Sequence, residues 1–577
     1  MPSNQRSEAD VLLAAILVFA GMVVVGGGAV VELATLLAGR GAAHLTVSSL
    51  TTGLLDWHEH PGNPRLAFAG PVAVGLPGAV GMYAAVGIVA AASAALGSVS
   101  WILHRRRSAR TRRLGDRRHR DGFASPRMLA RAFPVGVPGG LTVATPLPKG
   151  RPVVIPHERS VGALMAPRSG KSSSAVSHIL DAPGAVLATS SKRELLLATA
   201  TSRERSTGQS TLTFDPMEFC GWNHPIRWSP ISGCERPEVG MRRADALMAG
   251  TSTDSVTNGG FWKSAATMLL RCVLHACALD GAGVDTLRRW VADPKDLDLL
   301  DVLRGSPVAR AWLHDLALMT RQHGETVESV ALTTAVALDC LALPNVAQAC
   351  SPRPEEAFDA AGWISGGGTI HVVAPAAESA SVAPLTAAFV DDVVVAARAL
   401  AMARPDGRLD PPLRLVLDEL PNICPLPQVD SYLADGGGRG IQICWYAQAR
   451  SQLIERFGRD KASTILGATS VMLYGGGLHD PELLKDLSTM LGQVEVRTQT
   501  RNTAGTGLSS WSEQVRHVPV LEPAEIYRLA QFEALLMAGG TGGSLVRIKP
   551  WWERSDTRAV RAGIEDALRR CSKQSAA

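Results

Sequence analysis

The chain has 577 residues, several times the length of a typical domain, so we expect two or more folded domains with ample core. Its formal net charge is +5, but the segment 105–120 holds nine Arg and one Asp, a local +8 that leaves −3 for the remainder. This distribution argues against a broadly basic nucleic-acid-binding surface, because the positive charge is confined to one short segment.

Two uncharged stretches near the amino terminus are long enough to cross a membrane. Residues 11–31 form an apolar run of about 21 residues that ends at Glu32, against the roughly 20 that a spanning helix needs. The second run, 66–103, is too long for one span, and prolines and glycines interrupt its first third. We therefore expect transmembrane helices at about 11–31 and 82–103.

Basic residues predict the orientation of these spans. An Arg-rich juxtamembrane linker follows the second span, whereas the intervening loop, 39–65, holds only Arg40 and Arg65. Since Lys and Arg favour the cytoplasmic side, we expect a cell-membrane anchor at 1–120, with the amino terminus and the bulk of the chain after His104 in the cytoplasm. A cleaved signal peptide is the alternative, but two acids precede the first span and no small-x-small site follows in clear register.

The most informative motif is APRSGKSS, 166–173, which follows an apolar strand at 161–165 and opens a helix. Such a turn aims backbone N–H groups and the helix dipole at phosphate, while a Lys reaches the β- and γ-phosphates and a Ser can ligate Mg²⁺. The predicted nucleotide-binding residues are Pro167, Arg168, Ser169, Gly170, Lys171, Ser172 and Ser173, with Ser172 also a metal ligand. Met165 stands where the pattern has its first Gly, so either Pro167 sets the turn or the loop opens differently. A chance Gly-Lys-Ser turn is the alternative to a nucleotide site.

Strands and helices alternate after the linker. Strands are expected at 162–166, 185–188 and 210–214, and helices at 172–180 and 194–201. This order predicts a doubly wound parallel sheet that binds its ligand at the carboxyl ends of its strands. From about 237 to 358 the apolar residues recur at helical spacing, and strand signals resume at 369–373. We therefore expect an α/β domain in two parts, 121–236 and 359–550, an all-α insertion at 237–358 and a tail at 551–577.

The segment LRLVLDEL, 413–420, is an apolar strand that ends in two carboxylates. At the carboxyl end of a buried strand, Asp418 can hold the Mg²⁺ hydration shell beside Ser172, and Glu419 can polarise the attacking water. A solvated acidic turn is the alternative, and the phosphate-loop motif upstream argues against it.

Two further residues fit a hydrolytic site. Gln448 ends the next expected strand, 441–448, where its amide can sense a γ-phosphate or only cap backbone. Arg439, in the loop before that strand, could act as an arginine finger in a neighbouring subunit or remain an exposed turn residue. Trp551 and Trp552 are expected to pack rather than to stack on bases.

In their order, these motifs resemble the type IV coupling proteins of conjugation and type IV secretion, the TraG/TraD-like membrane ATPases. Beyond the spans and the phosphate loop, the resemblance rests on TSSKRELL from Thr189, TFDP at 213–216 and NGGFW at 258–262. It continues through LVLDELPNICPLP, ADGGGRGIQICWYAQARSQL and ATSVMLYGG, and so covers most of the chain.

The resemblance implies a RecA-like P-loop NTPase domain with an inserted all-α domain, behind a two-helix membrane anchor. It implies an ATPase that uses ATP and Mg²⁺, assembles as a homo-hexamer, and passes relaxase-bound single-stranded DNA from the relaxosome to a type IV secretion channel. The residues that match the family's pattern are Lys171 and Ser172 in the phosphate loop, Asp418 and Glu419 as metal and water carboxylates, Gln448 as sensor and Arg439 as finger. Some relatives recognise their substrates with a long acidic carboxyl tail. No long acidic run follows Trp552 here, so we expect the helical insertion to recognise the substrate.

Two other functions share parts of this pattern. A double-stranded DNA pump of the FtsK type also combines spans with a phosphate loop, but the helical insertion and the TFDP and NGGFW segments argue against it. A membrane docking receptor for secreted proteins could use nucleotide for assembly alone, and the presence of Glu419 and Gln448 argues against that.

Overall fold

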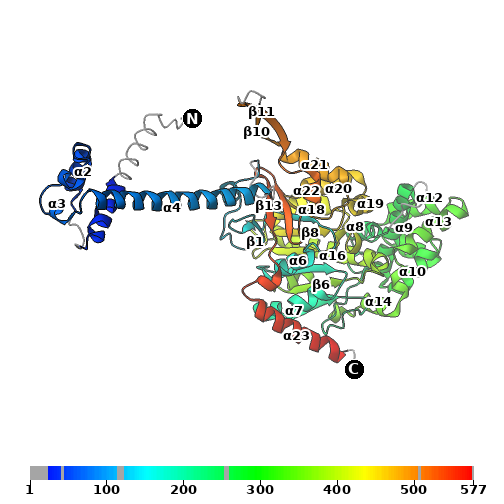
Figure 1. Ribbon diagram of the computed structural model, residues 1–577. Helices are drawn as coiled ribbons and strands as arrows, with labels where there is room; N and C mark the ends of the chain where they lie inside the picture. Colours follow the sequence, from blue (N-terminus) through cyan, green and yellow to red (C-terminus); the bar gives the residue numbers. More distant parts are fainter. Residues whose placement is uncertain (1–23, 40–44, 114–121, 252–258, 504–508, 575–577) are drawn as a thin grey trace. The chain divides into compact units, whose positions relative to one another are not determined.

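A computed structural model describes residues 24–39, 45–113, 122–251, 259–503 and 509–574 (Figure 1). The chain divides into two compact units, Met1–Asp116 and Arg117–Ala577. We refer to them as the amino-terminal and the carboxyl-terminal unit. Each has a hydrophobic core of its own.

The amino-terminal unit contains two apolar helices. The first, Val24–Leu37, continues past the expected end at Glu32, and residues 11–23 of the predicted span lie outside the described part. The second, α4 (Ala79–Arg113), begins before the predicted residue 82 and runs on through the basic residues. Its stretch Ala79–Ser98 is long and apolar enough to cross a membrane, and only 11% of it is buried.

The predicted external loop between these helices is folded. It contains α2 (Val47–Asp56), and the following residues form η1 (Trp57–Glu59), η2 (Pro64–Ala67) and α3 (Pro71–Gly75). Thr46 caps α2, because its hydroxyl accepts a hydrogen bond from the Ser49 N–H at 3.2 Å. Phe68 packs edge-on against Trp57. Residues 40–44 of this loop lie outside the described part.

An 11-stranded sheet forms the centre of the carboxyl-terminal unit, in the order β2-β1-β13-β12-β9-β3-β8-β7-β4-β6-β5. Its strands are β1 (Leu141–Pro146), β2 (Val153–Ile155), β3 (Val161–Leu164), β4 (Val186–Ser190), β5 (Thr211–Phe214), β6 (Thr369–Val373), β7 (Leu413–Leu417), β8 (Ile441–Ala447), β9 (Val471–Gly475), β12 (Glu533–Ala538) and β13 (Gly542–Arg547). The run from β9 to β5 is parallel, whereas β12, β13, β1 and β2 extend it in antiparallel fashion. The predicted α/β fold class is confirmed.

Both faces of this sheet are buried, as expected for parallel strands. On one face, β3 contributes Val161 and Ala163 to a core that includes Ile179 of α6 (Lys171–Leu180) and Leu195 of α7 (Glu194–Thr207). The other face packs on α16 (Ser379–Met402). Although α16 is apolar enough to pass as a membrane span, 72% of that apolar stretch is buried, so it is a core helix.

Eight described α-helices and two short 3-10 helices, η4 (Asp339–Ala342) and η5 (Pro354–Glu356), lie between β5 and β6, where the helical insertion was expected. The α-helices are α8 (Pro237–Ala249), α9 (Gly259–Asp280), α10 (Val284–Ala292), α11 (Leu297–Gly305), α12 (Arg310–Thr320), α13 (Gly324–Val336), α14 (Pro344–Ala349) and α15 (Ala360–Ser365). Most of them gather beside the sheet, in green in Figure 1. The first, α8, instead joins the helix layer on the sheet, since Arg242 and Arg243 pair with Asp391 and Asp392 of α16.

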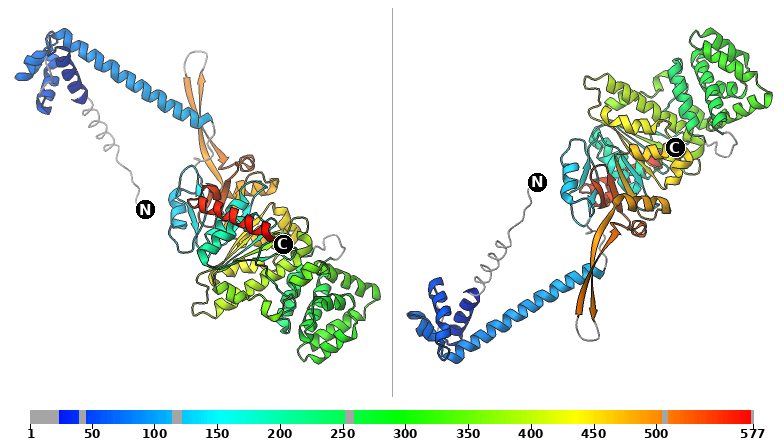
Figure 2. Two further views of the ribbon diagram at one scale, coloured as in Figure 1. Left: turned by 90° about the horizontal axis from the view of Figure 1, so that it is seen from below. Right: turned by 90° about the horizontal axis from the view of Figure 1, so that it is seen from above.

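The remaining elements connect or cover the sheet. They are α5 (Pro126–Ala132), α17 (Leu420–Ile423), α18 (Val429–Asp435), η6 (Gly436–Arg439), α19 (Arg450–Phe457), α20 (Arg459–Ala468), α21 (Pro481–Leu491), α22 (Pro523–Tyr527), η7 (Trp551–Glu553) and α23 (Thr557–Gln574). A two-stranded ribbon, β10 (Gln493–Thr503) with β11 (Ser509–Pro519), projects from this unit (Figure 2). Helix α23, within the predicted tail, packs along α7, with an ion pair of 2.7 Å between Arg570 and Glu204.

Candidate nucleotide-binding site

The phosphate-loop motif lies between β3 and α6, at the carboxyl edge of the parallel strands. Gly170 caps α6 with φ 116°, a left-handed conformation that favours glycine. The next residues, Lys171 to Ser173, form the first turn of the helix. Free N–H groups and the helix dipole at such an end favour an anion.

Met165 extends β3 instead of opening the loop. Its N–H donates to the Ala447 carbonyl of β8 at 3.1 Å, and its side chain is fully buried. Gly475 of β9 provides the space, since a Cβ there would lie 3.0 Å from the Met165 Cγ. The turn itself runs from Ala166 to Ser169, whose N–H donates to the Ala166 carbonyl at 3.4 Å.

Pro167 occupies the second position of that turn, and Arg168, the third, has φ 63°. This combination of Pro and a left-handed residue is typical of a type II turn. Of the two alternatives at Met165, the structure favours the one in which Pro167 sets the turn. Ser169 does not line the pocket. It stabilises the turn, because its hydroxyl donates to the Ala166 carbonyl at 2.5 Å.

Lys171 folds back over the loop, where its Nζ donates to the carbonyls of Met165 at 2.6 Å and Ala166 at 3.3 Å. Burial lowers the pKa of this ammonium group, and the carboxylates of Asp418 and Glu419 act in the opposite direction. Lys171 and Glu419 line the same pocket, and Asp418 directly precedes Glu419 in the chain.

Asp418 directly follows the end of β7 and is largely buried. Its Oδ1 has no hydrogen-bond partner among the described residues. Burial, reinforced by Glu419, raises the pKa of Asp418 to about 6, while Lys171 lowers it. A buried acceptor without a donor is costly. Together with the Ser172 hydroxyl on the first turn of α6, it offers the oxygen ligands that hydrated Mg²⁺ prefers, so these residues fit a magnesium site.

Glu419 and Gln448 meet at the carboxyl ends of β7 and β8. The Gln448 Nε2 donates to the Glu419 Oε1 at 3.3 Å, and the Ser191 hydroxyl donates to the same oxygen at 3.4 Å. Glu419 itself adopts a left-handed φ of 51° at the start of α17. The Gln448 amide thus bonds the side chain of Glu419, and both residues line the pocket.

Arg439 lies apart from this site. It ends η6 and is separated from β8 by Gly440 alone, so it stands at the amino end of the strand whose carboxyl end carries Gln448. Its Nε pairs with the Asp435 Oδ2 at 2.5 Å. Within one chain Arg439 is not among the residues that line the pocket.

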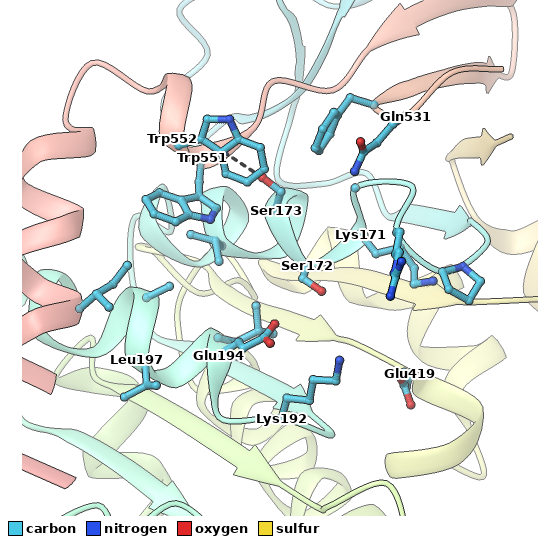
Figure 3. A pocket seen from close by; sticks show the side chains of 18 of the residues that line it. Lys171, Ser172, Ser173, Lys192, Glu194, Leu197, Glu419, Gln531, Trp551 and Trp552 are labelled. Carbon is cyan, nitrogen blue, oxygen red and sulfur yellow. Dashed lines mark hydrogen bonds between the residues drawn. The ribbon is translucent and has the colours of Figure 1, made fainter. Parts of the chain in front are cut away.

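The pocket has a volume of about 650 Å³ and runs from the phosphate loop along α6 (Figure 3). Of the predicted residues it is lined by Pro167, Arg168, Gly170, Lys171, Ser172, Ser173, Glu419 and Gln448. Sequence reasoning missed Lys192 and Glu194, although both lie in the short segment between the expected strand at 185–188 and the start of the expected helix at 194–201. It also missed Gln531 and Phe532, and it assigned Trp551 and Trp552 to packing alone.

Trp551 and Trp552 do pack, in edge-to-face contact with each other at 5.8 Å between ring centroids. Both also line the pocket, on the side opposite Glu194 and Leu197 (Figure 3). The two indoles therefore pack as expected, and they also form part of the pocket wall.

Comparison with known proteins gives one family and one fold. Residues 412–531 match the family model "TraM recognition site of TraD and TraG", a range that includes Asp418, Glu419, Arg439 and Gln448. It lies outside the helical insertion, where we expected substrate recognition. No curated protein matches the chain in sequence.

Among solved structures, the chain is similar to the bacterial conjugative coupling protein TrwB. The unbound TrwBΔN70 form has a TM-score of 0.56 at 19% identity, over 73% of this chain and 90% of that one. TrwB with ADP and Mg²⁺ has a TM-score of 0.56 at 19% identity, over 74% and 93%. At this identity the likeness shows the fold. Together with the family match, it confirms the resemblance to the coupling proteins.

Proposed function

Because the chain resembles the conjugative coupling proteins in its family match and in its fold, we propose that it is an ATP-driven coupling protein. In this proposal it recruits a relaxase-bound DNA strand and moves the DNA into a type IV secretion channel. One observation carries it: Lys171 of the phosphate loop, the acids that end β7 and the amide that ends β8 converge at one edge of one sheet.

Phosphate binding is assigned to the loop residues 167–173. The N–H groups of the first turn of α6 receive the phosphates, and Lys171 exchanges its bonds to the Met165 and Ala166 carbonyls for phosphate oxygens. Ser172 and Asp418 would hold Mg²⁺, which neutralises charge on the phosphates when bound. The structures of TrwB with ADP and Mg²⁺ and with the ATP analogue ADPNP support this choice of ligands.

Hydrolysis is assigned to Glu419 and Gln448. Gln448 and Ser191 hold the Glu419 carboxylate at one oxygen, which leaves the other oxygen to orient a water molecule. Lys192 extends into the same pocket beside Glu194 (Figure 3), so a second cation is available as negative charge develops. Arg439 would act in trans, on the nucleotide of a neighbouring subunit in a homo-hexamer.

The location follows from the amino-terminal unit and its two apolar helices, of which Ala79–Ser98 is long enough to span a bilayer. We place the carboxyl-terminal unit in the cytoplasm, because the basic residues in the last part of α4 favour that side of the membrane. The family match at 412–531 supports a relaxosome-type protein as partner, since the model is named for recognition of TraM.

The test is the ATPase rate of the full-length chain in detergent with single-stranded DNA, with duplex DNA and without DNA. The proposal predicts stimulation by single strands. Stimulation by duplex alone would favour a double-stranded DNA pump. No stimulation by either, together with DNA-independent hexamer formation on ATP, would favour a docking receptor for secreted proteins.

A further inference from the structure

We infer that Phe532, Trp551 and Trp552 form the wall on which the base of the bound nucleotide stacks, so that the carboxyl-terminal segment completes the nucleotide pocket. The inference rests on the proposed role of the phosphate loop. It assigns a purine nucleotide as the ligand and gives these aromatic residues a part in its selection.

The pocket has two chemically different ends. Lys171, Lys192 and Glu419 surround the end at the phosphate loop. Apart from Glu194, the lining farther along α6 and α7 is apolar, with Val176, Leu195, Leu197, Ala198, Trp551 and Ile564. A nucleoside triphosphate has the same division into a charged and a flat, largely apolar part, and binding sites commonly combine an apolar lining with a few placed polar groups.

The aromatic cluster leaves ring surface available. Trp552 contacts Phe532 at 5.5 Å and Trp551 at 5.8 Å between centroids, with both neighbours near perpendicular to it. It nevertheless remains 42% exposed. A large indole that is fixed by two neighbours and still accessible at a pocket is suited to stack on a further ring.

Backbone hydrogen bonds fix the cluster to two residues of the phosphate loop. The backbone N–H of Trp551 donates to the Ser173 hydroxyl at 2.9 Å, and the backbone N–H of Phe532 donates to the Ser169 carbonyl at 3.1 Å. Phe532 has a left-handed φ of 65°, and its ring lies so near Gly170 that a Cβ there would be 2.7 Å away. The wall is thereby held at a set distance from the phosphate-binding groups.

Ion pairs hold the rest of the segment in place. Arg554 makes a two-pronged contact with Asp181 at the end of α6, at 2.9 and 3.0 Å. Arg570 pairs with Glu204 of α7 at 2.7 Å. Since the segment is bound to the two helices that flank the pocket, the aromatic wall is preformed and requires little ordering when a ligand binds.

Stacking distinguishes nucleotides by the ring area of the base and not by the hydrogen-bonding groups on its edge, because every base presents a π-face. The wall therefore predicts that adenine and guanine nucleotides bind about equally, and more tightly than pyrimidine nucleotides or inorganic tripolyphosphate.

The experiment is a calorimetric titration of the full-length chain in detergent with ADPNP, with its guanine and cytosine counterparts and with inorganic tripolyphosphate. Trp552→Ala should weaken ADPNP binding about tenfold and leave tripolyphosphate binding unchanged, whereas Trp552→Phe should retain most of the affinity. Phe219→Ala removes an aromatic residue that is 46% exposed and lies outside the pocket, and it serves as the matched control.

Lys171→Ala distinguishes this inference from the proposed function, since it should weaken both ADPNP and tripolyphosphate. If Lys171→Ala has that effect while Trp552→Ala and Phe532→Ala bind ADPNP like the wild type, the base wall is refuted and the phosphate loop stands. If the wild type binds neither ligand, the proposed function fails, and this inference fails with it. Equal melting temperatures of the variants exclude unfolding as the cause.

Discussion

Gln448 donates a hydrogen bond to Glu419, 3.3 Å from Nε2 to Oε1, and so joins the carboxyl ends of two neighbouring parallel strands. Neither strand could present both groups alone. The bond orients a carboxylate next to the loop that carries Lys171, and it defines the site at which we expect hydrolysis.

Glu419→Gln should reduce ATP turnover by about 10² to 10⁴-fold, the range by which a positioned base contributes, and leave ATP binding nearly unchanged. Gln448→Ala should also reduce turnover, but less, because Ser191 still holds the same carboxylate oxygen. Steady-state rates and analogue titrations measure the two quantities. A Glu419→Gln chain that hydrolyses ATP at the wild-type rate would remove Glu419 from the chemistry.

Met165 and Gly475 should be energetically coupled, because a Cβ at 475 would lie 3.0 Å from the Met165 Cγ. Gly475→Ala should lower the free energy of unfolding of the carboxyl-terminal unit by about 1–3 kcal/mol through overpacking. Met165→Ala should cost about 2–5 kcal/mol through a cavity.

The double variant should cost at least about 0.5 kcal/mol less than the sum of the two, since the smaller side chain makes room for the new methyl group. Denaturant unfolding measures all three changes. Strict additivity would show that Met165 does not depend on the glycine opposite it.

His178 should make the stability of the carboxyl-terminal unit depend on pH. It is fully buried between Tyr446, 2.6 Å from Nδ1, and Ser174, and burial, together with Arg414, lowers its pKa to about 3. The unfolded chain takes up the proton near pH 6.5, whereas the folded chain does not. The stabilisation is therefore complete above pH 6.5 and is lost as the pH falls from there toward 3.

The predicted loss is about 1.4 kcal/mol per pH unit for this one group. Denaturant unfolding between about pH 5.5 and 4, where the unfolded imidazole is nearly fully protonated, should show a slope that is smaller by this amount in His178→Gln. Identical slopes in the two proteins would contradict the assignment. His371, buried and likewise with a pKa of about 3, should behave in the same way.

Arg439→Ala should reduce turnover by about 10³-fold or more while leaving ATP affinity nearly unchanged, if the residue acts in trans on the transition state. Mixing provides a sharper test. Chains with Arg439→Ala and chains with Lys171→Ala should each be inactive, and a mixture should regain activity where an intact loop meets an intact Arg439. Asp435→Asn, which removes the partner of Arg439, controls for loss of the ion pair. A mixture that stays inactive would refute the role in trans.

The sequence predicted the parallel part of the sheet and the core of the site because both are local signals. An apolar strand followed by Gly-Lys-Ser, or by two acids, can be recognised from a few consecutive residues. Parallel strands then bring their carboxyl ends together. For this reason the sequence alone predicts one site from Lys171, Asp418, Glu419 and Gln448.

The other half of the pocket depends on pairings between distant segments. Phe532 and Trp551 reach the loop through β12 and β13, which extend the sheet beyond β9 in antiparallel order. Nothing in the sequence around Phe532 or Trp551 indicates that these residues lie next to the phosphate loop. Lys192, in contrast, follows β4 at the same edge as the other site residues, so the strand order alone could have identified it.

The most direct test of the central claim is DNA transfer from donor cells whose own copy of this chain is deleted and replaced by an introduced copy. Donors that express the wild-type chain should transfer DNA, and donors that express Glu419→Gln at the same membrane level should transfer at least about 10²-fold less, because transport requires hydrolysis at this site. Transfer by the Glu419→Gln chain at the wild-type frequency would contradict the account of an ATP-driven coupling protein.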